Sequence, residues 1–136
     1  DRLVITLRGE FDDGDARLLE AAVREHLSGA APGSLVALVH LGDLSRCTLS
    51  GRDGLLAVQK LLGGIARRTA YLAQRPIFRG LGLWICHQAP DSNARTFPAL
   101  DLAASWLGSA EPRERALAEQ AAAWIGRLSG AKEARP

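Results

Sequence analysis

The residues with the clearest chemical potential are polar side chains between Gly42 and Asp53. This segment follows an apolar run and precedes a helical pattern, and ligands or partners of α/β proteins bind at such strand ends. It carries three hydroxyl groups, on Ser45, Thr48 and Ser50. A phosphate added there would be stabilised by the free N–H groups and the dipole of the following helix. The three hydroxyls are therefore candidate phosphorylation sites.

Two carboxylates lie in the same segment. Asp43 follows the apolar run, and we expect its side chain to accept hydrogen bonds from backbone donors in a turn. Asp53 lies three residues after Ser50, a spacing that fits a helix-capping arrangement worth about 1 kcal/mol. A contribution to binding is the alternative for Asp53, and the two roles are compatible.

The histidines and cysteines form neither a catalytic nor a metal-binding pattern. Cys47 and Cys86 occur in no Cys-x-x-Cys or Cys/His ligand spacing, so we expect two reduced thiols. His26, His40 and His87 are dispersed along the chain. A Cys/His nucleophile pair needs a positioned base and an oxyanion pocket, and no flanking motif supports Cys47 with His40. We expect no enzymatic activity, no metal and no cofactor.

Composition restricts the class of partner. The chain has 136 residues, 47% of them hydrophobic and 24% charged, which is typical of a globular domain. Its net charge of +2 is small and its basic residues are scattered, so we expect no nucleic-acid binding. No apolar run approaches the ~18 residues that a membrane span requires. No signal-peptide pattern opens the sequence, and we expect a cytoplasmic location.

The elements that must position these residues alternate between strand and helix. Alternating or unbroken apolar runs predict strands over residues 3–7, 35–41, 69–73 and 93–97. Helical spacing predicts helices over residues 16–27, 51–62, 76–85, 100–107 and 111–128. Asp13 and Asp15 are the expected caps of the first helix. The alternation predicts an α/β fold with a mainly parallel or mixed sheet.

Several short phrases, in this order, resemble the STAS domain, the anti-sigma factor antagonist-like fold. In the first half they are Gly9-Glu10-Phe11-Asp12, Asp43-Leu44-Ser45 followed by Thr48, and Gly54-Leu55. In the second half they are Arg68-Thr69-Ala70-Tyr71, Arg95-Thr96-Phe97 and Ala103-Ala104-Ser105-Trp106-Leu107, similar to the SpoIIAA-like branch. The resemblance implies an α/β sandwich with a four- or five-stranded mixed sheet and about four helices. It divides the chain into a STAS-like domain, residues 1–108, and a C-terminal helix and tail, residues 109–136.

The resemblance also singles out one position. In anti-sigma factor antagonists, the serine just before the glycine that opens the helix is phosphorylated by a partner kinase. Here Asp53 occupies that position, directly after Arg52. The resemblance thus implies a permanent negative charge where the family places a reversible one, with partner binding through the same surface.

The function implied by this resemblance is a non-enzymatic interaction module with a protein partner, in a bacterial regulatory system or a larger assembly. The expected contact residues are Asp43, Leu44, Ser45, Arg46, Thr48, Ser50, Arg52 and Asp53. One alternative is a module for a lipid-like apolar ligand, held between the sheet and the helix over residues 77–85, which Gly80 and Gly82 weaken. Another is homodimer formation through the helix over residues 111–128, whose apolar stripe includes Trp124.

Overall fold

The computed structural model describes residues 2–90 and 92–108. In this part of the chain strands and helices alternate, as the sequence predicts. The elements are β1 (Arg2–Phe11), α1 (Asp13–Leu27), β2 (Leu35–Cys47), α2 (Leu49–Gly63), β3 (Ala66–Leu72), α3 (Pro76–Gln88), β4 (Ala94–Phe97) and α4 (Leu100–Leu107). The expected C-terminal helix and its possible dimer contact lie outside the described residues, as does the second of the two expected domain segments.

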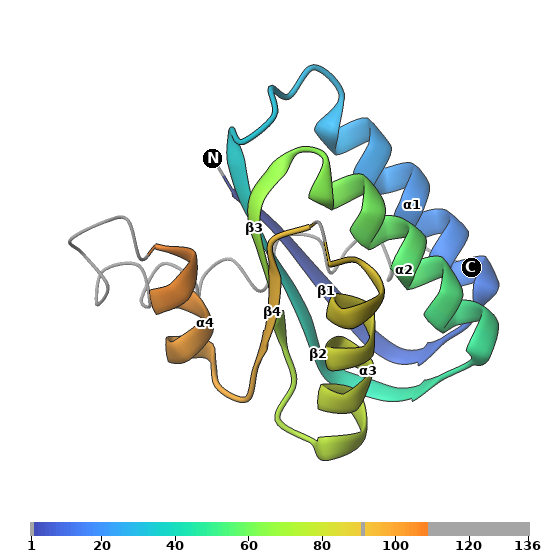
Figure 1. Ribbon diagram of the computed structural model, residues 1–136. Coiled ribbons are helices and arrows are strands. Elements are labelled where there is room, and N and C mark those ends of the chain that lie inside the picture. The colour runs from blue at the N-terminus through green and yellow to red at the C-terminus, as the bar shows by residue number, and fades with distance from the viewer. Residues whose placement is uncertain (1, 91, 109–136) are drawn as a thin grey trace.

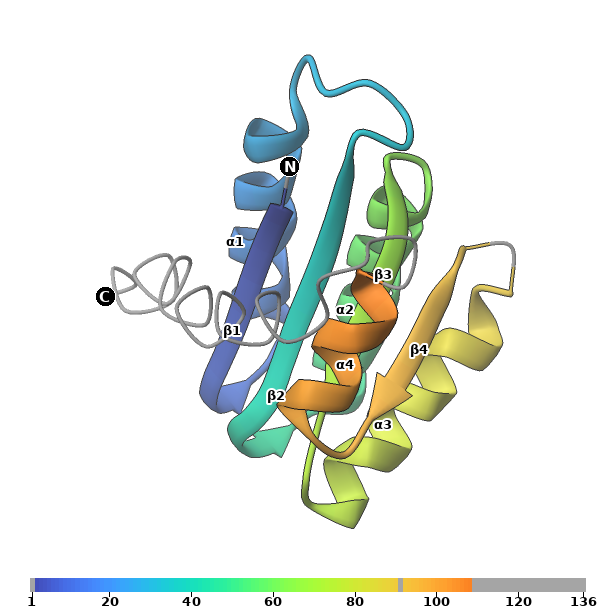
Figure 2. The same cartoon turned by 90° about the vertical axis from the view of Figure 1, so that its left-hand side faces the viewer.

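The four strands form one sheet in the order β1-β2-β3-β4, and the three described pairings are all parallel. Four strands and four helices agree with the expected α/β sandwich. Helices α1, α2 and α3 cover one face of the sheet, and α4 covers the other (Figures 1 and 2). Because both faces are covered, the interior strand β2 can be apolar without alternation, which explains its unbroken run of apolar residues.

Alternating strand residues supply two cores, one on each face. The larger core lies under α1, α2 and α3 and contains Leu3, Ile5, Leu7, Ala37, Val39 and Leu41 from β1 and β2. The smaller core lies under α4 and contains Val4, Val36, Leu38, Ala70 and Leu72. Helix α4 contributes Ala103, Ala104 and Leu107 to it. Helices thus bury both faces of the sheet.

Strands β1, β2 and β3 are longer than the sequence predicts, and the extension of β2 includes the most candidate site residues. The expected loop beginning at Gly42 is wrong in its first part, because β2 continues to Cys47. There it pairs with the end of β1, with Phe11 opposite Cys47, after register shifts along the pair. Gly9 has a positive φ of 65°, a conformation that glycine adopts without steric cost, at the site of these shifts. The residues after Leu41 are mostly polar, so the sequence pattern indicated a loop rather than a continued strand.

Both helix caps differ from the expected ones. Asp12, not the expected Asp13, is the N-cap of α1. The expected Asp15 does take part, because its carboxylate accepts from the Asp12 backbone N–H and completes a capping box. Thr48 caps α2, because that helix begins at Leu49 rather than near Gly51. The predicted cap by Ser50 and Asp53 is therefore wrong, since both residues already lie inside the helix.

The described residues include no helix that is long and apolar enough to cross a membrane.

Candidate functional site

A cavity of about 470 Å³ opens where the end of β2, the start of α2 and the face of α3 meet. It lies at the edge formed by the carboxyl ends of the parallel strands, the usual binding edge of such sheets. Its lining combines basic, hydroxyl and apolar side chains: Ser45, Arg46, Cys47, Thr48, Leu49, Arg52, Arg75, Ile77, Phe78, Gly80, Leu81 and Trp84. We call this space the β2–α3 cavity.

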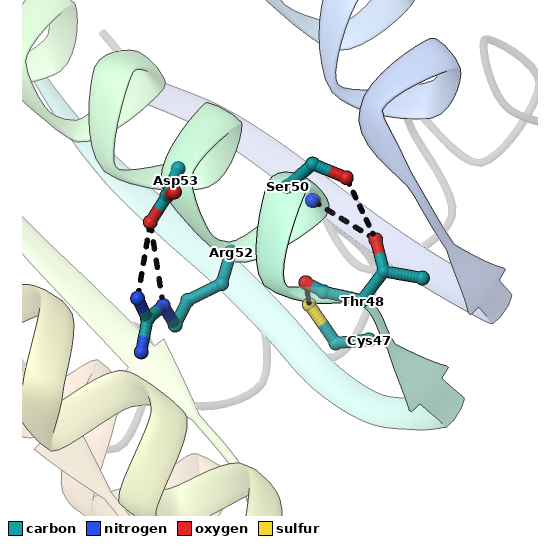
Figure 3. Close-up of polar contacts among 6 residues, drawn as sticks. Cys47, Thr48, Ser50, Arg52 and Asp53 are labelled. Atoms are coloured by element: carbon teal, nitrogen blue, oxygen red, sulfur yellow. Dashed lines mark hydrogen bonds and ion pairs between the residues drawn. The ribbon is translucent and has the colours of Figure 1, made fainter.

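The start of α2 is fixed against the end of β1. The Thr48 N–H donates to the carbonyl of Phe11 at 3.0 Å, and the Thr48 Oγ1 accepts from the Gly51 N–H at 3.0 Å. A Cβ at Gly51 would lie 2.5 Å from the Phe11 carbonyl oxygen, so glycine permits this close approach. The Thr48 and Ser50 hydroxyls lie 3.4 Å apart (Figure 3). These contacts hold the first turn of α2 in place beside the cavity.

Three arginines bring positive charge to the cavity. Arg52 lies over the Trp84 ring, 4.0 Å from its centroid, and its Nη2 is 3.2 Å from the Asp53 carboxylate. Arg75 lies over the Phe78 ring at 4.5 Å and donates to the carbonyl of Gly42 at 3.4 Å. Arg46 is exposed and forms no ion pair with the residues that the structure describes. None of the described residues that line the cavity is acidic.

Two large apolar side chains are exposed at the edge of the cavity. Leu49, in the first turn of α2, is 73% exposed, and Ile77, in the first turn of α3, is 75% exposed. Phe78 is buried below them, and Trp84 is half-buried two turns further along α3. The two helices therefore present apolar groups to solvent beside the arginines.

The structure separates the predicted contact residues into groups. Ser45, Arg46, Thr48 and Arg52 line the β2–α3 cavity, and Asp53 is tied to it through Arg52. Arg52 and Asp53 lie on one side of the first turns of α2, and Ser50 lies on the other (Figure 3).

Two other predicted residues do not contribute as expected. Leu44 is 1% exposed and belongs to the larger core, so its side chain is not part of the contact surface on which we placed it. Its position on the inward side of β2 is the physical reason, because the strand continues past Gly42. Asp43 is exposed but does not line the cavity. Its carboxylate lies 3.7 Å from Arg8 Nε and 3.9 Å from His40 Nδ1.

The cavity residues on α3 were not among the predicted contacts, although the alternative of an apolar ligand used this helix. Ile77 and Trp84 are seven residues apart, so they lie on one side of a helix. Arg75 and Pro76 precede them at the helix start. This stripe was visible in the sequence, but its contact with Arg52 depends on how α2 and α3 pack on the sheet.

His40 should make stability depend on pH. Burial lowers its pKa below the ordinary value of 6.5; nearby Asp43 raises the pKa and Arg8 lowers it, both by smaller amounts. The unfolded chain therefore binds a proton at a higher pH than the folded chain, and acidification below about 6.5 favours unfolding. We expect the melting temperature to fall between about pH 7.5 and 5.5, and to fall less in His40→Gln. An identical fall in both proteins, measured by circular dichroism, would exclude His40 as the cause.

The β2–α3 cavity combines charged and apolar groups. Within the described ranges, no group of three or more His, Cys, Asp or Glu side chains could hold a metal ion. The Cys47 thiol donates to the carbonyl of Thr48 at 3.5 Å (Figure 3). Guanidinium groups over aromatic rings, beside exposed aliphatic side chains, can hold a group that is both apolar and acidic.

Comparison with known proteins supports the fold. No protein-family model and no curated protein matches the chain. Among solved structures, it is similar to an uncharacterized protein from the DUF3478 family with a SpoIIAA-like fold, from Shewanella loihica PV-4. That match has 18% sequence identity and a TM-score of 0.61, and covers 76% of this chain and 82% of the other. The fold is SpoIIAA-like, which confirms the expected STAS-type architecture.

Proposed function

We propose that this SpoIIAA-like domain is a non-enzymatic binding module that docks a protein partner beside the β2–α3 cavity. The docking surface consists of Arg46, Leu49, Arg52, Asp53 and Ile77. Of the surface predicted from sequence it keeps Arg46, Arg52 and Asp53, and it adds Leu49 of α2 and Ile77 of α3. Leu44 is omitted because its side chain is buried.

The observation that carries this proposal is the exposure of Leu49 and Ile77 on either side of a cavity that arginines line. Removing exposed apolar groups from water against a partner lowers the free energy and so favours binding. Arginine and aromatic groups dominate the binding energy of many protein interfaces, and Arg52 over Trp84 combines both. The start of α2 is fixed to β1, so docking would cost little conformational entropy.

The charges of the docking surface favour a partner with an acidic patch. Arg46 is exposed, and among the residues that the structure describes Arg52 forms an ion pair only with Asp53. Complementary charge raises the rate of association and selects against partners that carry the same sign. Asp53 contributes specificity in this account, because its charge next to Arg52 orients the guanidinium group. That charge is permanent and needs no kinase.

Replacing Asp53 by Arg tests the proposal. The variant puts a long side chain in place of a short carboxylate within the docking surface and removes the contact that orients Arg52, so the shape of the surface no longer fits the partner. We expect at least tenfold weaker partner binding, although the variant adds positive charge. Glu25→Arg, at the exposed C-terminal end of α1, is the matched control because it changes the net charge equally.

The measurement has two steps. A partner is captured from extracts of the native source with the wild-type domain, and its Kd is then measured with each purified variant. We expect Glu25→Arg to bind like the wild type and Asp53→Arg to bind weakly while keeping its melting temperature. Equal Kd values for all three proteins would exclude this docking surface.

A further inference from the structure

We infer that the β2–α3 cavity binds a small amphipathic anion, which has one acidic head group on a single apolar chain. This inference goes beyond the docking of a protein partner. It does not depend on that proposal, because it is tested on the isolated domain.

The size and walls of the cavity fit the apolar part of such a ligand. Its volume of about 470 Å³ falls in the range of roughly 300–1,000 Å³ typical of small-molecule sites. Phe78, Leu81 and Trp84 line it from α3, and Leu49 lines it from α2. An alkyl chain placed between these groups would remove apolar surface from water on both sides.

The charge of the cavity fits the head group. Arg46, Arg52 and Arg75 line it, and no acidic residue does so among the described residues. Arg52 lies over the Trp84 ring and Arg75 over the Phe78 ring, so both guanidinium groups contact the apolar wall. A carboxylate or a phosphate matches the two parallel N–H donors of a guanidinium group. The chemistry therefore selects an anion over a neutral or cationic amphiphile.

Two features allow an anion to compete for these arginines. The Arg52–Asp53 pair is exposed, and exposed ion pairs contribute little free energy because solvent screens them. The first turn of α2 contains no acidic residue and its N-terminal end lies at the cavity, where the helix dipole adds positive potential. The ligand head is thus expected near Arg52 and Thr48.

Gly80 offers a way to block the cavity without disturbing the fold. It lines the cavity, is exposed, and a Cβ built on it would meet no atom within 4 Å. Gly80→Leu adds an aliphatic side chain at this wall, and Gly80→Ala is the matched control with the same backbone change. Both substitutions favour the helix, so loss of binding in Gly80→Leu cannot be attributed to unfolding.

The experiment is isothermal titration of the wild-type domain with decanoate, decyl phosphate, decanol and decylamine, all below their micelle concentrations. We expect saturable 1:1 binding of both anions, at least tenfold weaker binding of decanol, and no binding of decylamine. The tighter of the two anions identifies the head group. Gly80→Leu and Arg46→Gln should each weaken anion binding at least tenfold, and Gly80→Ala should not.

Three results would overturn the inference. The first is that neither anion shows saturable binding. The second is that decanol binds as tightly as the anions. The third is that Gly80→Leu binds the anions as tightly as the wild type, which would show that they adsorb elsewhere on the domain. Because no protein partner is present in the titration, these results leave the docking proposal standing. Conversely, a failure of Asp53→Arg to weaken partner binding would leave the ligand result unaffected.

Discussion

Gly54→Ala is expected to lower the free energy of unfolding by about 1–3 kcal/mol, although alanine is the better helix former. A Cβ at Gly54 would lie 2.3 Å from the Cβ of Ala16, at the contact between α1 and α2. Real Cβ atoms do not approach this closely, so the two helices must move apart. Urea denaturation at constant protein concentration measures the loss.

A second substitution separates this steric effect from a general loss of stability. Ala16→Gly removes the opposing methyl group and alone should cost about 0.5–1 kcal/mol, because glycine is a poor helix residue. In the double variant the clash is absent, so its loss should be smaller than the sum of the single losses by at least about 1 kcal/mol. Gly80→Ala is the control, because a Cβ added at Gly80 meets no atom within 4 Å; it should stabilise the domain slightly. Additive losses would contradict the packing of α1 on α2 described above.

The double charge reversal Arg46→Glu and Arg52→Glu is expected to weaken partner binding at least 100-fold. Each reversal replaces an attraction to an acidic partner by a repulsion, and every tenfold change corresponds to about 1.4 kcal/mol. The second reversal also places a carboxylate beside Asp53 and removes the guanidinium group from the Trp84 ring. The effect should shrink in high salt, because exposed charges are screened.

Lys60→Glu with Arg67→Glu is the matched control for this prediction. Both residues are exposed, neither lines the β2–α3 cavity, and the change in net charge is the same. We expect the control to bind the captured partner within about threefold of the wild type, a change well below 1 kcal/mol. Equal weakening in both double variants would show that net charge, and not the docking surface, determines binding.

Most strands and helices could be predicted from the sequence, because their hydrophobic patterns are local. The unbroken run that ends at Leu41 indicated an interior parallel strand, and β2 is one. The continuation of β2 to Cys47 was missed because it depends on pairing with the end of β1, which lies more than 30 residues earlier. Thr48 was missed as a cap for the same reason, since the end of the strand determines where α2 begins.

The candidate site was only half predictable. Residues of β2 and α2 that line the cavity are near one another in sequence, and Ser45, Arg46, Thr48 and Arg52 were among those expected. The opposite wall comes from α3, and Trp84 meets Arg52 only because both helices pack on the same face of the sheet. The apolar stripe of α3 could be predicted from its helical spacing, but the direction in which it faces relative to α2 could not.

The most direct test of the docking surface is nuclear magnetic resonance mapping of the captured partner on the ¹⁵N-labelled domain. We predict that amide signals of residues 45–54 and 75–84 shift or broaden on titration, whereas those of α1 and α4 stay unchanged. Shifts confined to α1 or α4, with residues 45–54 unaffected, would contradict the proposed docking surface.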